Sequence, residues 1–170
     1  MLLEGEGTKK DVKRGINLLE QAYKKKGLPG TRFLAFAHLK GNGVKKDPKK
    51  AIEMLEKISS QDTFSLEKLG LIYYEGVDVP RDPKKAFFYF QKAGEKLSVV
   101  GLYNMALMYS NGDGVEPDLR KSALLYENLV ELGDAQSMIQ LGFFYFLGNG
   151  VKKNDKKGFY FIFCYIIFYY

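Results

Sequence analysis

Apolar residues recur along this chain with the period of an α-helix, and the same arrangement returns every 35 or 36 residues. In each block, a small residue has mostly apolar residues one and four positions before it and an aromatic residue or histidine three positions after it. These offsets share one side of a helix, so the pattern predicts an α-helix with one buried stripe, named helix A here. The stripe residues are Thr31, Leu34, Ala35 and His38; Leu66, Leu69, Gly70 and Tyr73; Leu102, Met105, Ala106 and Tyr109; and Met138, Leu141, Gly142 and Tyr145.

A polar loop with two glycine positions follows each helix A. The first position suits a left-handed C-cap, which glycine adopts at little cost. Its residues are Gly5, Gly41, Gly76, Gly112 and Gly148. The second position holds glycine in four loops and Asp78 in the remaining one. We expect the same left-handed conformation at Asp78, because aspartate tolerates it better than most residues.

A second helix, named helix B, follows each loop. An N-capping residue stands six positions after the first glycine, and Pro48 and Pro83 occupy the first helical position after two of these caps. The caps are Asp11, Asp47, Asp82, Asp118 and Asn154. The buried stripe of helix B is predicted at Ala51, Met54, Leu55 and Ile58; Ala86, Tyr89, Phe90 and Ala93; and Ser122, Leu125, Tyr126 and Leu129.

A helix pair of about 36 residues cannot bury both of its faces alone, whereas stacked copies can. The segments LGLIYYEGVDVPRDPKKAFFYFQKA (69–93) and MALMYSNGDGVEPDLRKSALLYENL (105–129) resemble the Sel1-like repeat, a relative of the tetratricopeptide repeat. The resemblance covers essentially the whole chain. It implies an all-α fold, a right-handed α-solenoid of antiparallel helix pairs. We expect a repeat array over residues 1–158, with units at about 1–27 (partial), 28–60, 61–96, 97–133 and 134–170.

The two ends depart from this pattern. The first residues of the sequence correspond to the end of a helix A, so we expect the chain to be a fragment of a longer array. Residues 159–170 form an apolar, aromatic tail, too short to span a bilayer. Three interpretations stay open: an incomplete or wrongly read last helix, a surface covered by a second copy or a further repeat, or shallow insertion into a membrane surface. We expect poor solubility of the full chain.

Composition narrows the class of protein. With 46% hydrophobic and 15% aromatic residues, a chain of 170 residues buries a core, which excludes intrinsic disorder. Cys164 is the single cysteine, so no disulfide forms within the chain. Met1–Gly7 lacks the basic and apolar stretches of a signal peptide. We expect a cytoplasmic protein, with an upstream signal left open.

No group of residues indicates catalysis. His38, the only histidine, has no evident base, nucleophile or metal-ligand partner, and the G-x-G loops follow helices and lack the spacing of phosphate-binding motifs. Cys164 has no cationic neighbour to activate its thiol. We therefore predict no enzyme activity, no metal and no cofactor. The alternative is a hydrolase of β-lactams, as described for cysteine-rich relatives of the resembled family, but we expect no S-x-x-K serine motif.

Basic pairs follow the helix B caps, and stacking should align them as a ridge. The ridge residues are Lys49, Lys50, Lys84, Lys85, Arg120 and Lys121, with similar pairs at 13–14 and 156–157. The ridge is either an anion-binding edge, for an acidic protein or anionic lipid, or a solvated edge. Nucleic acid is not expected as a partner, because no aromatic residues interleave with the pairs.

The resemblance also implies where a partner binds, since such solenoids line their concave face with helices A. This surface, named the A face here, is predicted to comprise Arg32, Phe36, Glu67, Leu71, Tyr74, Tyr103, Leu107, Phe143 and Phe146. One column of it (Phe36, Leu71, Leu107, Phe143) is equally compatible with the core, whereas Tyr74, Tyr103 and Phe146 are expected to be exposed.

We predict a non-enzymatic scaffold or adaptor that binds a peptide or protein on this face. The alternative is a structural spacer in a larger membrane-associated quality-control or signalling complex. No transmembrane span is expected in either case, and self-association through the chain ends remains open.

Overall fold

The computed structural model describes residues 11–169, and within them it contains nine α-helices and no strand. The loop predicted around Gly5 and Gly7, and Tyr170 at the end of the tail, lie outside the described residues. The fold is the predicted all-α solenoid. Its helices are α1 (Val12–Lys24), α2 (Leu28–Lys40), α3 (Pro48–Ile58), α4 (Thr63–Glu75), α5 (Pro83–Gly94), α6 (Val99–Asn111), α7 (Leu119–Glu131), α8 (Ala135–Leu147) and α9 (Asp155–Tyr169).

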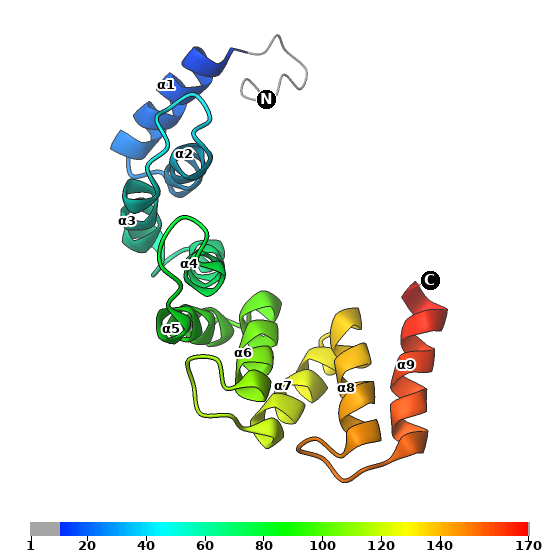
Figure 1. The fold of residues 1–170 in the computed structure, drawn as a ribbon. Coiled ribbons are helices and arrows are strands. Elements are labelled where there is room, and N and C mark those ends of the chain that lie inside the picture. The colour runs from blue at the N-terminus through cyan, green and yellow to red at the C-terminus, as the bar shows by residue number, and fades with distance from the viewer. Residues whose placement is uncertain (1–10, 170) are drawn as a thin grey trace. The chain divides into compact units, whose positions relative to one another are not determined.

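The chain divides into two compact units, residues 1–81 and residues 82–170. The first contains α1 to α4 and the second contains α5 to α9 (Figure 1). Within each unit, every helix packs against the next one along the chain. The even-numbered helices are the predicted helices A, and the odd-numbered ones are helices B.

The predicted caps begin each helix B and end each helix A. The side chains of Asp11, Asp47, Asp82, Asp118 and Asn154 accept hydrogen bonds from backbone N–H groups in the first turn of α1, α3, α5, α7 and α9. Each helix A ends at a left-handed glycine: Gly41, Gly76, Gly112 and Gly148. Residue 78 differs from the prediction, because Asp78 has no positive φ. Its carboxylate instead forms an ion pair with Lys46, at 2.5 Å.

The cores of the two units draw largely on the predicted stripes, with further buried residues, such as Ala123 and Phe144, that the stripes did not include. In the first unit, Leu34, Ala35 and Leu69 of helices A and Ala51 and Leu55 of α3 are all buried, and α3 packs against both α2 and α4. In the second unit, the buried cluster contains Ala106, Ala123, Tyr126, Leu129, Leu141, Phe144 and Tyr145.

Helix α9 continues the array but carries apolar residues on its outer side. Phe159, Phe163, Ile166 and Ile167 are all more than half exposed. Their spacing places them along one side of the helix. None of the helices within residues 11–169 is both long and apolar enough to cross a bilayer.

Candidate functional site

Arg32 and Phe36 on α2 converge on the first turn of α4. The Arg32 guanidinium donates hydrogen bonds to both carboxylate oxygens of Asp62, with an Nε–Oδ2 distance of 3.3 Å, and lies 4.9 Å from the centre of the Phe64 ring. Phe36 meets the same ring edge-on, with centroids 5.8 Å apart. Lys68 Nζ lies 5.1 Å from that ring. Two predicted A-face residues are thus anchored by Asp62 and Phe64, which sequence reasoning missed.

The remaining predicted residues of the first unit are half-buried. Glu67 and Leu71 lie along α4, and Tyr74 lies near its end. Arg81, from the loop after α4, places its guanidinium 5.3 Å from the centre of the Tyr74 ring and donates a hydrogen bond from Nε to the Tyr74 carbonyl, at 3.0 Å. The expectation that Tyr74 is exposed is wrong, because this arginine covers it.

In the second unit, Tyr103 begins an aromatic chain into the core. Its ring lies 5.8 Å from that of Tyr126, which lies 5.4 Å from Phe144, both in edge-to-face geometry. Burial raises the pKa of Tyr103, and the nearby Asp134 carboxylate raises it further. A hydrogen bond with the Gln140 side chain lowers this pKa, but by less. Burial likewise raises the pKa of Tyr126 well above its ordinary value. Tyr103 is therefore half-buried and held against α8, not exposed as expected.

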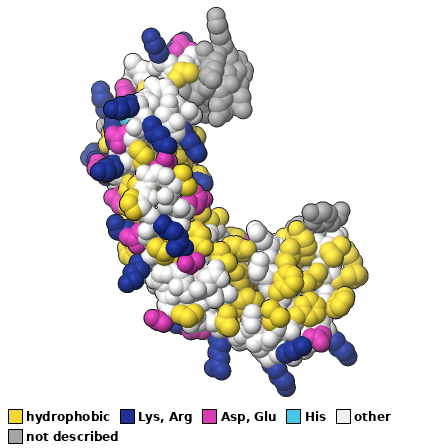
Figure 2. Space-filling view, in the orientation of Figure 1, with side chains coloured by type: hydrophobic (Ala, Val, Ile, Leu, Met, Phe, Trp, Pro, Cys, Tyr) yellow, Lys and Arg dark blue, Asp and Glu magenta, His cyan; other side chains and the backbone are white. Residues whose placement is uncertain are grey.

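Phe143 is the predicted residue that projects furthest into solvent, with half of its surface exposed. It lies on α8 one turn after Gln140, the hydrogen-bond partner of Tyr103, while Leu107 follows Tyr103 by one turn on α6. Phe146 is half-buried and meets Phe159 of α9 edge-on, at 5.9 Å. Hydrophobic side chains gather over α6, α8 and α9 on the face shown in Figure 2.

The expected order of exposure is thus reversed in the second unit. Phe143, whose column was equally compatible with the core, is exposed, whereas Tyr103 and Phe146 are covered in part by α8 and α9. In the first unit, Phe36 and Leu71 of that column are half-buried. The exposure of each side chain depends on whether a neighbouring helix covers it, because the residue types at these positions are similar.

All six predicted ridge residues are exposed. In two of the pairs, the second lysine forms an ion pair with the capping aspartate of its own helix. Lys121 Nζ lies 3.3 Å from Asp118 and 5.2 Å from the centre of the Tyr109 ring. The Lys121 backbone N–H, which donates to Asp118, is the main cause that lowers the pKa of that carboxyl group. Lys85 lies 3.8 Å from Asp82. The alignment of the pairs into one ridge stays a prediction.

The expected absence of an S-x-x-K motif is wrong, because Ser65-Leu66-Glu67-Lys68 matches it. The match has a structural origin. Ser65 is fully buried, and both its backbone N–H and its hydroxyl donate hydrogen bonds to the Asp62 carboxylate that caps α4. A hydroxyl held in this way is closed to a substrate, so the motif does not indicate a nucleophile.

The two other candidate groups are the His38 imidazole and the Cys164 thiol. His38 is buried, with Nδ1 3.3 Å from the Lys45 carbonyl oxygen, and Cys164 is a free, half-buried thiol. Within residues 11–169, no three His, Cys, Asp or Glu residues are arranged to hold a metal ion.

Helix pairs stacked in successive repeats define an α-solenoid repeat protein. The family model described as Sel1 repeat matches residues 1–26, 29–62, 64–96, 99–134 and 135–162. The chain belongs to the Sel1 repeat family. Sel1 repeats are generally protein-interaction modules and typically a non-catalytic fold.

Solved structures give the same result. A Sel1 repeat protein from Oxalobacter formigenes is 27% identical with a TM-score of 0.83, and the match covers 98% of this chain and 69% of that one. The protective antigen c5321 of uropathogenic Escherichia coli, with an SLR fold, is 26% identical with a TM-score of 0.90, covering 98% of this chain and 36% of that one. Cysteine-rich protein B of Helicobacter pylori is 27% identical with a TM-score of 0.52, covering 68% and 89%. The comparison with curated proteins found no match.

Proposed function

We propose that this chain is a non-enzymatic scaffold that binds a peptide or protein segment on the A face of its second unit. The observation that carries the proposal is the exposed ring of Phe143 on α8, a helix that also carries the half-buried Phe146, while the half-buried Tyr103 and Leu107 lie on α6 of the same unit. Aromatic residues are enriched among the side chains that dominate binding energy at interfaces, especially where they project from a packed surround. The expected partner places an apolar side chain against the Phe143 ring.

The experiment is an affinity pull-down with the full chain, followed by mass spectrometry. The Phe143→Ala variant removes the projecting ring, whereas Phe88→Ala removes an equally exposed ring from α5, a helix B. We expect Phe143→Ala to lose the captured partner and Phe88→Ala to retain it. Equal retention by both variants would exclude this face, and capture of no partner by the wild type would favour the spacer.

The first unit contributes less to this proposal. Arg32 and Phe36 are engaged with Asp62 and Phe64, and Arg81 covers Tyr74. Such residues gain less from a partner, because contacts within the chain already satisfy them. We therefore assign Arg32, Phe36, Glu67, Leu71 and Tyr74 a supporting part, on the first unit's own portion of the A face.

The exposed side of α9 favours a second candidate, self-association with another copy of the chain. In α7, a helix B with a following helix A, Ala123 is buried and Val130 is half-buried. The equivalent residues of α9 are the exposed Phe159 and Ile166. A contiguous apolar stripe of this kind is typical of an interaction surface.

A further inference from the structure

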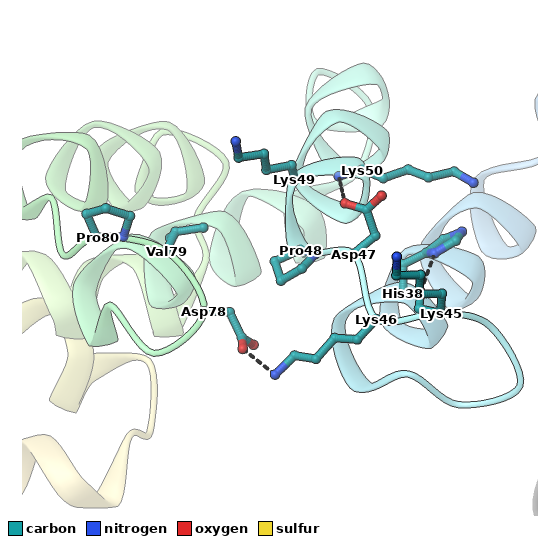
Figure 3. A pocket seen from close by; sticks show the side chains of 10 residues that line it. All are labelled: His38, Lys45, Lys46, Asp47, Pro48, Lys49, Lys50, Asp78, Val79 and Pro80. Carbon is teal, nitrogen blue, oxygen red and sulfur yellow. Dashed lines mark hydrogen bonds and ion pairs between the residues drawn. The ribbon is translucent and has the colours of Figure 1, made fainter.

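A pocket of about 550 Å³ lies beside the first turn of α3 in the first unit (Figure 3). It is formed by the end of α2, the loop that leads into α3, and the loop that follows α4. Four lysines line it: Lys45, Lys46, Lys49 and Lys50. Figure 3 shows Lys46 reaching across to Asp78 of the second loop, while Lys49 and Lys50 extend from α3 in different directions.

The pocket coincides with a break in the repeat pattern at residue 78. In the second unit, the equivalent glycines lie against the first turn of the preceding helix B. A Cβ atom added to Gly114 would lie 2.3 Å from the Pro83 carbonyl carbon, and one added to Gly150 would lie 2.0 Å from the Leu119 carbonyl oxygen. Asp78 carries a side chain, so its loop cannot approach α3 as closely. The first turn of α3 consequently remains open.

A second break supplies a free cation to the same pocket. In the repeats with Tyr109 and Tyr145, the lysine equivalent to Lys50 lies over the tyrosine ring, with Lys121 Nζ at 5.2 Å and Lys157 Nζ at 4.9 Å from the ring centres. Residue 38 replaces that tyrosine with histidine. Lys50 therefore has no tyrosine ring to occupy it.

The charges around the pocket are unbalanced. The Asp47 carboxylate accepts a hydrogen bond from the Lys50 backbone N–H, and Asp78 pairs with Lys46. Across residues 11–169, none of Lys45, Lys49 and Lys50 takes part in an ion pair. His38 lines the same pocket and is 93% buried; its Nδ1 faces the Lys45 carbonyl, and its Nε2 has no hydrogen-bond partner in the described part of the chain. These groups favour an anionic ligand.

The lining also indicates which anion fits. Pro48 has no N–H and the Asp47 side chain already occupies the Lys50 N–H, so the start of α3 offers few backbone donors to a phosphate group. Lysine ammonium groups are point charges on flexible stems and can follow carboxylates placed at several positions. Val79 and Pro80 add an apolar wall that suits the methylene groups of acidic side chains.

We propose that this pocket binds an acidic segment of a partner protein, with Asp or Glu carboxylates held by Lys45, Lys49 and Lys50. The site is separate from the A face of the second unit and does not depend on binding there. It assigns a ligand class to one part of the predicted basic ridge, namely Lys49 and Lys50, and adds Lys45 and His38, which the ridge did not include.

The test is fluorescence anisotropy of a labelled oligoglutamate peptide with the full chain at low ionic strength, where surface charges are least screened. Replacing Lys45, Lys49 and Lys50 together by alanine should weaken binding about tenfold, since three exposed charge pairs are lost. The matched control replaces Lys25, Lys40 and Lys57, exposed lysines that belong neither to the pocket nor to the basic pairs, and changes the net charge equally. It should bind within about twofold of the wild type.

A second variant retains every lysine. His38→Tyr restores the residue that occupies this position in the other repeats, so the fold should accept it, and the new ring should engage Lys50. We expect this variant to bind the peptide about threefold more weakly than the wild type, a smaller loss than in the triple lysine variant, because only Lys50 is engaged. The site is excluded if the triple lysine variant binds within about twofold of the wild type, or if the control loses as much. Displacement of the peptide by inorganic phosphate at equal charge concentration would equally overturn the assignment to carboxylates.

Discussion

The guanidinium of Arg32 on α2 forms an ion pair with the carboxylate of Asp62, the N-cap residue of α4. The carboxylate is buried, and Ser65 supplies its other hydrogen bonds. This pair links helices A of two successive repeats at the point where α4 begins. The contact therefore connects the start of a helix to the packing between repeats.

We predict that Arg32→Met lowers the free energy of unfolding by about 2 kcal/mol, because the buried Asp62 carboxylate loses its cation. Urea denaturation measures the change. The control is Lys92→Met, which removes an exposed i, i+3 pair with Glu95 and should cost less than about 0.5 kcal/mol. Equal effects of the two substitutions would show that the Arg32 pair is no stronger than a surface pair.

Gly150→Ala should destabilise the second unit by about 3 kcal/mol, through a backbone conformation that disfavours alanine and a clash with the preceding helix B. Its φ is +66°, and the new Cβ would lie 2.0 Å from the Leu119 carbonyl oxygen. Gly133→Ala separates the two causes, because Gly133 also has a positive φ but no atom within 4 Å of the added Cβ.

For Gly133→Ala only the conformational cost remains, about 1 kcal/mol. Thermal unfolding followed by circular dichroism compares the two variants. If Gly150→Ala lowers the stability no more than Gly133→Ala does, the loop that contains Gly150 moves away from α7 without cost.

The sequence predicts the starts of helices B, the ends of helices A and most of the buried stripes correctly, because these depend on residues within about one or two turns of each other. Asp47 caps α3 through an N–H three residues away, and Gly41 ends α2 by its own conformation. Such local signals also recur in successive blocks, which makes each one easier to recognise.

Contacts between neighbouring repeats were harder to predict. Phe64 receives Phe36 and Arg32 because α2 and α4 lie at one particular distance and rotation, which no local pattern specifies. A usable signal does exist for Asp62, since Asp62, Ser98 and Asp134 each stand eight residues before the small residue of their helix A and cap it. The cover of Tyr74 by Arg81 depends on the path of a loop, which the sequence does not fix.

Alkaline pH should destabilise the protein partly through Tyr126. Burial raises the pKa of Tyr126, so the folded chain retains the phenol proton at a pH where the unfolded chain, with a pKa near 10, releases it. The contribution to stability is constant below about pH 10 and decreases as the pH rises above that value. Tyr126→Phe should therefore reduce the loss of unfolding free energy between neutral and strongly alkaline pH.

Urea denaturation at a series of pH values measures this difference. Tyr103→Phe serves as the comparison, because the pKa of Tyr103 is also raised but its ring is only half-buried. We expect a smaller reduction for Tyr103→Phe than for Tyr126→Phe. The same alkaline slope in the wild type and in Tyr126→Phe would exclude Tyr126 as a source of the pH dependence.

The apolar side of α9 should make the full chain associate with itself. Phe163 and Ile167 project from the same side of the helix, and more than half of each side chain is exposed. We predict that the sedimentation coefficient of the wild type rises with protein concentration and that Phe163→Lys/Ile167→Lys abolishes this rise, because charges at the contact oppose its desolvation. Leu124→Lys is the control, since Leu124 is similarly exposed on α7 and should leave the association unchanged. A wild-type chain that stays monomeric at high concentration would exclude a second copy as the occupant of this surface and would favour a further helix A in its place.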